Sequence, residues 1–248
     1  MKYARIDLLP LITAILLLVL AQPSKASDNA TSVGDVPVNL KEPGSPCGPA
    51  QNTYGPFDYR TAHRNQKNIV ESAHFTPMVE ALRGGQTGGS AGGDIYYTLS
   101  VFPNHHRALV AVDRLADKEK TDPPKRAGLK VECWYIRAIR WVNDDLIVRL
   151  LYADFLVRQN RVPDALSQID YAVERADGNP FTHYNAGLVY MSAKAYGRAL
   201  AQAHKAIELG MTQDNLKRQL QDAGQWREPD VRPVTGVVGD PILLAPIR

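Results

Sequence analysis

The sequence predicts an all-α protein built from antiparallel helix pairs. Two observations carry this prediction. Small residues occupy the same three places in two consecutive 34-residue segments, 146–179 and 180–213, with no insertion or deletion between them. Before these segments, from residue 68 onwards, apolar residues recur at helical spacing and are separated by Gly, Pro and Asn. Because one helix pair cannot bury its apolar face alone, we expect consecutive pairs to pack against each other.

The small residues lie at the eighth, twentieth and twenty-seventh places of each segment. The second segment also carries tyrosines at places eleven and seventeen. The residues expected to pack the repeats are Ala153, Ala165, Ala172, Gly187, Tyr190, Tyr196, Ala199 and Ala206. In their length and in these positions, the two segments resemble the tetratricopeptide repeat (TPR) family. The resemblance implies a TPR-like α-solenoid, in which small residues let neighbouring helices approach closely.

The preceding elements follow from local start and stop signals. A helix is predicted from Asn68, and a shorter one from Thr76-Pro77 to about Arg83, because Thr is a good N-cap and Pro suits the first helical turn. The glycine-rich stretch 84–93 is predicted to be a flexible linker. It lacks the Gly-Lys-Ser/Thr ending of a phosphate-binding loop.

Three further helices are expected over 94–101, 105–118 and 131–142, and Asp122-Pro123-Pro124 interrupts the chain between the last two. After residue 213, Leu216 and Leu220 share one face of a predicted C-terminal capping helix. Such a helix covers the apolar side that the last repeat would otherwise expose.

The helical domain is therefore predicted to span 68–226, with Trp226 folding back onto it. An extended, proline-rich tail is expected over 227–248.

The first 26 residues are typical of a secretory signal peptide. Lys2 and Arg5 precede an apolar run, and Ser24-Lys25-Ala26 offers small residues at a cleavage site. An uncleaved anchor, which would make the protein a membrane-tethered assembly factor, is the alternative. The apolar run of about 13 residues is shorter than the ~20 of a membrane-spanning helix. Removal of residues 1–26 would lower the formal net charge from +3 to +1.

Residues 27–67 are predicted to form an extended or disordered N-terminal arm, because Pro, Gly, Ser and Asn are frequent there and no periodicity is visible. Its rings Tyr54, Phe57 and Tyr59 are candidates to pack onto the folded body. Cys47 of this arm could pair with Cys133 in an oxidising compartment. Alternatively, Cys133 is a small packing residue and Cys47 a free thiol.

Several classes of function are disfavoured. The charge is nearly balanced, and basic residues alternate with acidic ones, so no nucleic-acid partner is expected. No nucleophile motif is present, and neither an enzyme nor a cofactor is predicted. The alternative is a metal-binding or enzymatic protein that uses His74, His105 and His106. Adjacent residues of a helix point about 100° apart, however, so His105 and His106 cannot chelate one ion as an i, i+4 pair would. His183 and His204 are interpreted as structural.

The chain also resembles exported bacterial TPR proteins in its segments HFTP (74–77) and FPNHH (102–106). This resemblance implies a periplasmic scaffold or adaptor, active in envelope assembly, that binds a protein or peptide along a concave face. The first helix of each repeat would line this face with Arg107, Ala111, Arg114, Leu150, Asp154, Arg158, Phe181, Tyr184, Leu188 and Met191. The groove is thus predicted to be basic at one end and apolar and aromatic at the other, with Tyr184, Leu188 and Met191 exposed. The Lys and Asn pattern that clamps a C-terminal carboxylate is missing.

Overall fold

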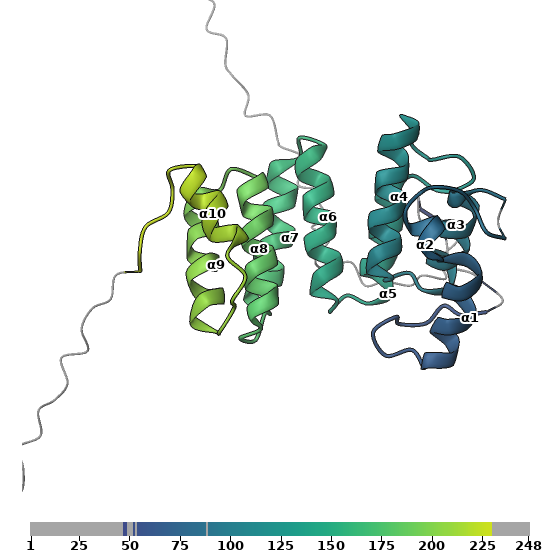
Figure 1. Ribbon diagram of the computed structural model, residues 1–248, viewed down its shortest axis with the longest axis horizontal. Helices are drawn as coiled ribbons and strands as arrows, with labels where there is room; N and C mark the ends of the chain where they lie inside the picture. Colours follow the sequence, from purple (N-terminus) through teal and green to yellow (C-terminus); the bar gives the residue numbers. More distant parts are fainter. Residues whose placement is uncertain (1–46, 49–51, 53, 88, 230–248) are drawn as a thin grey trace, which may run out of the picture. The chain divides into compact units, whose positions relative to one another are not determined.

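A computed structural model describes residues 47–48, 52, 54–87 and 89–229, and within them every regular element is an α-helix (Figure 1). The helices are α1 Arg64–His74, α2 Pro77–Glu80, α3 Ala91–Val101, α4 His106–Glu119, α5 Val131–Trp141, α6 Leu146–Arg158, α7 Val162–Glu174, α8 Pro180–Ser192, α9 Tyr196–Glu208 and α10 Asn215–Asp222. They belong to one packed unit, in which helices adjacent in the sequence form antiparallel pairs. The all-α prediction is confirmed.

The pairs α6/α7 and α8/α9 repeat the same local structure. Each of these four helices has 13 residues, and the second pair begins 34 residues after the first. Asp145 and Asn179, which are also 34 residues apart, cap α6 and α8 by accepting backbone N–H bonds. The turns inside the pairs contain Asn160 and Lys194 in the left-handed conformation, with φ of 60° and 58°. The period read from the sequence is therefore the period of the helix pairs.

The small residues of this period lie where helices touch. All six are buried in the core: Ala153, Ala165, Ala172, Gly187, Ala199 and Ala206. A Cβ atom placed on Gly187 would lie 2.3 Å from Cδ2 of Leu216, so this position has no room for a side chain. Tyr190 is also buried, and Tyr196 is half-buried. The repeat-packing residues predicted from the sequence thus occupy packed positions.

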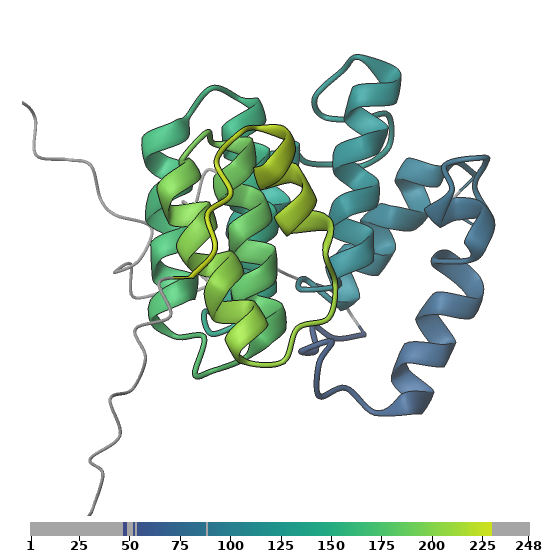
Figure 2. The ribbon, with the colours of Figure 1, turned by 60° about the vertical axis from the view of Figure 1, so that its left-hand side comes forward.

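The helix α10 covers the end of the last pair, as expected for a capping helix. It packs against α8 and α9, which come forward with it in Figure 2. Its Leu216 and Leu220 are almost fully buried. Trp226 folds back and places its ring 4.9 Å from that of His204. His183 is buried beside Gln202, with 2.7 Å between Nδ1 and Oε1, which fits its structural interpretation.

Two boundaries in the N-terminal part differ from the prediction. The helix α1 begins at Arg64, inside the predicted arm, because His63 and Gln66 form a capping box that starts the helix earlier. The helix α3 begins at Ala91, inside the predicted linker, and Ser90 caps it by accepting from the N–H of Gly93. The preceding turn is anchored as well, since the N–H of Gln86 donates to Asp94 at 2.6 Å.

The aromatic residues of the arm pack onto the helical body, as the sequence suggested. Tyr54, Phe57 and Tyr59 surround a small core that contains Val70 and Phe102. The backbone N–H of Phe57 donates to the carbonyl oxygen of residue 101 at 2.8 Å, which fixes the segment to the end of α3. Expectations for residues 1–26, for residues 27–46 and for the tail beyond 229 lie outside the described residues.

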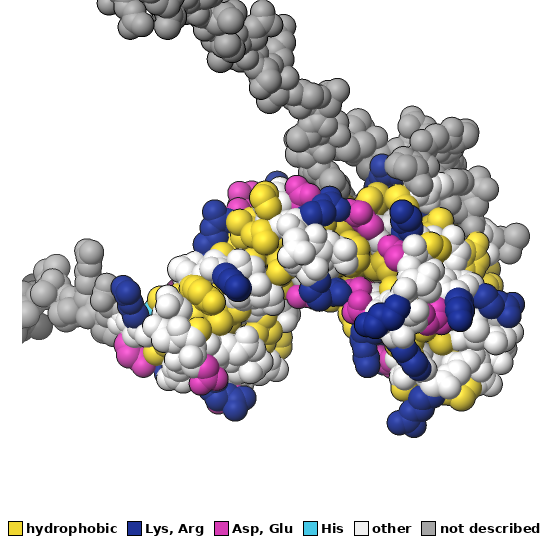
Figure 3. Space-filling view, turned by 90° about the horizontal axis from the view of Figure 1, so that it is seen from above, with side chains coloured by type: hydrophobic (Ala, Val, Ile, Leu, Met, Phe, Trp, Pro, Cys, Tyr) yellow, Lys and Arg dark blue, Asp and Glu magenta, His cyan; other side chains and the backbone are white. Residues whose placement is uncertain are grey.

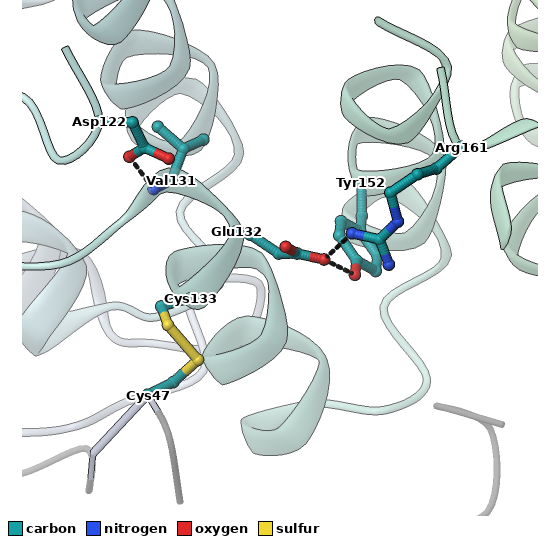
Figure 4. The surroundings of a disulfide bond; sticks show 7 residues. All are labelled: Cys47, Asp122, Val131, Glu132, Cys133, Tyr152 and Arg161. Carbon is teal, nitrogen blue, oxygen red and sulfur yellow. Dashed lines mark hydrogen bonds and ion pairs between the residues drawn. A yellow bond between two sulfur atoms is a disulfide. The ribbon is translucent and has the colours of Figure 1, made fainter. Parts of the chain in front are cut away.

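A disulfide joins Cys47 to Cys133 at the start of α5, with the two Cα atoms 5.0 Å apart (Figure 4). This pairing decides between the two alternatives for the cysteines. The preceding residue of α5, Glu132, points away from the disulfide and accepts hydrogen bonds from Tyr152 and Arg161. The helix α5 is therefore tied to the arm on one side and to the α6/α7 pair on the other.

Disulfides persist mainly in oxidising compartments outside the cytosol, so the pairing indicates an extracytoplasmic environment. In the described part of the chain, no helix has the length and apolar character needed to cross a membrane.

Candidate functional site: the groove between α4 and α6

A groove with a volume of about 200 Å³ runs between α4 and α6. Its floor is apolar, and charged residues border it. Figure 3 shows a hollow in the described body with Lys, Arg, Asp and Glu side chains around its rim. The groove is lined by Glu80, His106, Arg107, Val110, Ala111, Arg114, Ile147 and Leu151. The residues of α4 recur at intervals of three and four, and Ile147 and Leu151 are four apart. Each set therefore lies on one helical face.

A hydrogen-bonded cluster holds the N-terminal ends of α4 and α6 together. Nε2 of His106 lies 2.9 Å from the carboxylate of Asp145, which also accepts from Nδ2 of Asn104 at 2.9 Å. Burial alone would raise the pKa of Asp145, but the hydrogen bonds from these two side chains outweigh burial and lower that pKa. Asp145 is therefore a buried carboxylate that caps α6 and fixes its distance from α4.

An ion-pair cluster closes the C-terminal ends. Arg158 of α6 donates to both oxygens of Asp113 on α4, and its Nη1 lies 3.6 Å from Asp117. Within α6, Nε of Arg158 donates to Asp154 at 3.2 Å. Burial raises the pKa of Asp113, while the hydrogen bond and the charge of Arg158 oppose that rise. Since both ends are cross-linked by polar contacts, the two helices hold the groove open between them.

The two arginines of α4 have different surroundings. Arg107 is paired, because its guanidinium lies 3.3 Å from Glu80 and over the ring of Phe75. Arg114 is exposed and makes neither a hydrogen bond nor an ion pair with any residue that the structure describes. The groove therefore combines an apolar floor with one positive charge that no described carboxylate neutralises.

Beside the groove, His105 acts as a structural residue. It is fully buried and caps α4, with Nδ1 accepting from the N–H of Ala108 at 3.2 Å. Its Nε2 must therefore carry the proton and donate to Glu71, which lies 3.1 Å away and also accepts from the hydroxyl of Tyr59 at 2.6 Å. Burial lowers the pKa of His105, so the ring is neutral.

The three histidines of the metal-binding alternative are held by three different carboxylates. His74 contacts Asp94, His105 contacts Glu71, and His106 contacts Asp145. Among the described residues, no group of three or more His, Cys, Asp and Glu side chains is placed to hold a metal ion. The described geometry therefore gives no support to a metal site at these histidines.

The predicted concave-face residues have several fates. Arg107, Ala111 and Arg114 line the groove, and Asp154 and Arg158 belong to the cluster that closes it. The remaining five stand apart from the groove: Phe181 is exposed, Leu188 and Met191 are half-buried against the core, and Leu150 and Tyr184 are buried.

The expectation that Tyr184 lies exposed in an apolar-aromatic end of the groove is wrong, and so is the placement of Leu150 on an open face. Tyr184 is 7% exposed and Leu150 is 2% exposed. The reason is that α6 and α8 contact helices on more than one side: α6 packs against α4, α5, α7 and α8, and α8 packs against α6, α7, α9 and α10.

The sequence prediction missed the two residues of α6 that form part of the groove floor. Ile147 was recoverable, since it stands 34 residues before Phe181 and so has the same place in the repeat. Leu151 carries no such signal. Its exposure to the groove depends on how far α4 lies from α6, which only the packed structure defines.

Comparison with known proteins does not place this chain in a class. No protein-family model, no curated protein and no solved structure matches it. What the fold and the site define is an all-α protein of antiparallel helix pairs with a groove between two parallel helices.

The arm is expected to become less stable in acid. The hydrogen bond with His105 is the main cause that lowers the pKa of Glu71 to about 2. Burial raises the pKa of Asp58, but hydrogen bonds from Arg60 and Asn104 lower it to about 2. Since both values are below those of the unfolded chain, their stabilisation is complete above about pH 4.5 and is lost as the pH falls toward 2.

This prediction is tested by urea unfolding at several pH values. The unfolding is monitored by the near-ultraviolet circular dichroism of the arm tyrosines. The Glu71→Gln variant is the control, and its midpoint should fall less steeply between pH 4.5 and 2. An identical slope in both proteins would contradict the assignment to Glu71.

Proposed function

We propose that this protein is a periplasmic TPR-type scaffold that binds an acidic segment of a partner protein in the groove between α4 and α6. The observation that carries the proposal is the uncompensated charge of Arg114 above the floor formed by Ala111, Ile147 and Leu151. It is a non-enzymatic function, in which binding itself is the activity.

The chemistry of the groove favours a particular kind of segment. A volume of about 200 Å³ accommodates one or two side chains, and an apolar floor rewards the burial of an aliphatic or aromatic group. A carboxylate next to that group would meet Arg114, whose guanidinium can donate two parallel hydrogen bonds. The preferred ligand is therefore a peptide with Asp or Glu close to a large apolar residue.

The groove is also prepared for binding before a ligand arrives. The Asp145 cluster and the Arg158 cluster join α4 to α6 at opposite ends. Binding of a ligand therefore costs little conformational entropy in the site, and this strengthens binding for a given contact area.

Two further features support a periplasmic repeat scaffold. The helix pairs α6/α7 and α8/α9 repeat with the 34-residue period and the packed small residues that characterise TPR proteins. The Cys47–Cys133 disulfide agrees with export directed by a signal peptide at residues 1–26.

The experiment is a selection of peptides on the purified protein, followed by titration of the selected peptide. We expect enrichment of Asp or Glu beside an apolar residue. Arg114→Ala should lower the affinity for the selected peptide about tenfold. Leu151→Glu should abolish binding, because it places a carboxylate in the apolar floor.

Arg218→Ala is the matched control, since this arginine is exposed on α10, away from the groove residues. The proposal is wrong if the selected peptide binds both groove variants as well as it binds the control. A second experiment is photo-crosslinking from position 114 in the cell envelope. It identifies the natural partner if the groove is used, and the absence of any crosslinked protein would contradict the proposal.

A further inference from the structure

A second, larger cavity lies between α3, α5, the loop before α5 and the disulfide. Its volume is about 460 Å³, and it is distinct from the α4/α6 groove. The lining residues are Cys47, Gly48, Tyr96, Arg126, Gly128, Leu129 and Arg137. Two of them are arginines, and no acidic residue is among them.

Arg137 is unusual because it is a buried cation with no anion beside it among the described residues. It is 5% exposed, and its Nε finds no hydrogen-bond acceptor in the described part of the chain. No ion pair or hydrogen bond joins its guanidinium to any residue that the structure describes. The guanidinium lies 4.9 Å from the ring centre of Trp134. Burial lowers the pKa of Arg137, yet an arginine keeps its proton in proteins, so the buried positive charge persists.

Arg149 shows what a satisfied buried arginine looks like in the same molecule. It is 2% exposed, and its Nη1 donates to Gln168 at 2.9 Å. Its Nε donates to the carbonyl oxygen of Asn143 at 3.1 Å, and its guanidinium stacks on Tyr171 at 3.6 Å. Arg149 therefore needs no external partner. Arg137 has an aromatic neighbour but none of these acceptors, and it lines a cavity instead of filling one.

The second arginine is held at the cavity by a loop that fits closely onto α3. A Cβ atom on Gly92 would lie 2.0 Å from the carbonyl oxygen of Lys125, so the loop backbone rests directly on this glycine. The next residue, Arg126, has a left-handed backbone with φ of 62°, and its guanidinium lies against Gly89. Beyond it, Gly128 lies under the ring of Tyr96.

We infer that this cavity binds a small organic anion whose carboxylate or phosphate group is held by Arg137 and Arg126. A guanidinium pairs with either group through parallel hydrogen bonds, and a buried unpaired charge is strongly stabilised by such a partner. Tyr96 and Leu129 provide an apolar wall for the body of the ligand. The site uses none of the groove residues, so it does not depend on the proposed scaffold function.

The experiment measures thermal unfolding and binding heat with four probes at constant ionic strength: phosphate, acetate, phenyl phosphate and benzoate. Phosphate and acetate report the preferred head group, and the ring-bearing probes report the apolar wall. We expect at least one ring-bearing probe, phenyl phosphate or benzoate, to give a saturable binding heat and to raise the Tm by on the order of 5 °C at concentrations far above its Kd. The Arg126→Gln variant should fold normally and bind about tenfold more weakly.

The decisive variant is Arg137→Met. Without an oxyanion, it should keep or raise the Tm, because it removes an unpaired buried charge. With the probe that binds the unaltered protein best, the variant should show none of the Tm increase that this probe gives the unaltered protein. A merely structural arginine would lower the Tm equally with and without the probe.

Arg218→Gln, which changes an exposed arginine of α10 that lines neither the groove nor this cavity, should respond like the unaltered protein. If Arg137→Met fails to fold, the binding heats of Arg126→Gln and Arg218→Gln decide the question. The inference is overturned if none of the four probes gives a saturable binding heat, or if Arg126→Gln and Arg218→Gln bind the probe equally.

Discussion

Loss of the disulfide between Cys47 and Cys133 is expected to lower the free energy of unfolding by about 4–5 kcal/mol. The two cysteines are 86 residues apart, and the loop that they close contains α1 to α4. Reduction frees this loop in the unfolded chain and so raises the entropy of the unfolded state. The double variant Cys47→Ser/Cys133→Ser makes the loss permanent.

The measurement is urea unfolding of the unaltered protein and the double variant, each with and without a reducing agent. Reduction should shift the unaltered protein to the midpoint of the variant and leave the variant unchanged. Equal midpoints for the oxidised protein and the variant would show that the disulfide contributes nothing to stability.

Replacement of Gly187 by leucine is expected to destabilise the protein by about 3 kcal/mol, the upper part of the range for overpacked cores. Even the Cβ atom would lie 2.3 Å from Leu216, and it would meet Gln202 of α9 at 3.4 Å. The new side chain must therefore push α10 away from α8 and α9. Because Leu216 and Leu220 hold this cap, the apolar end of the last pair would become exposed.

The matched control is Gly197→Leu in α9, where an added Cβ meets no described atom within 4 Å other than those of its chain neighbours and its own helix backbone. A leucine there adds helix propensity without a clash, so the Tm should stay unchanged or rise. Equal melting temperatures for Gly187→Leu and the control would contradict the close contact between α8 and α10.

The helix pairs over 146–213 were predictable because their signals are local. Asp145 and Asn179 cap the helices that begin after them, and small residues recur at the same places of each segment. The start of α1 was missed, since His63 is a weak cap by itself and works here through its reciprocal bond with Gln66. The start of α3 was missed because glycines normally indicate a linker, whereas here Gly92 makes room for the loop backbone.

The two sites were predictable to different degrees. The sequence placed Arg107 and Arg114 on one helical face, and the structure adds Ile147 and Leu151 from the neighbouring helix. The anion site had no signal at all. In the sequence, Arg137 looks like any other arginine of an amphipathic helix. Its burial arises only because the loop, the arm and α3 enclose it in the folded structure.

Taken alone, the sequence determined the helix class, the 34-residue period, the cap and the positions that must be small, because each depends on backbone preferences and on spacing along one helix. Only the tertiary structure decided which cysteine alternative holds, that Tyr184 is covered, and that Arg114 and Arg137 differ in burial. These properties depend on distances between segments far apart in the chain. A residue's own sequence neighbours carry no information about such distances, since burial and pairing arise from the surfaces that packing brings together.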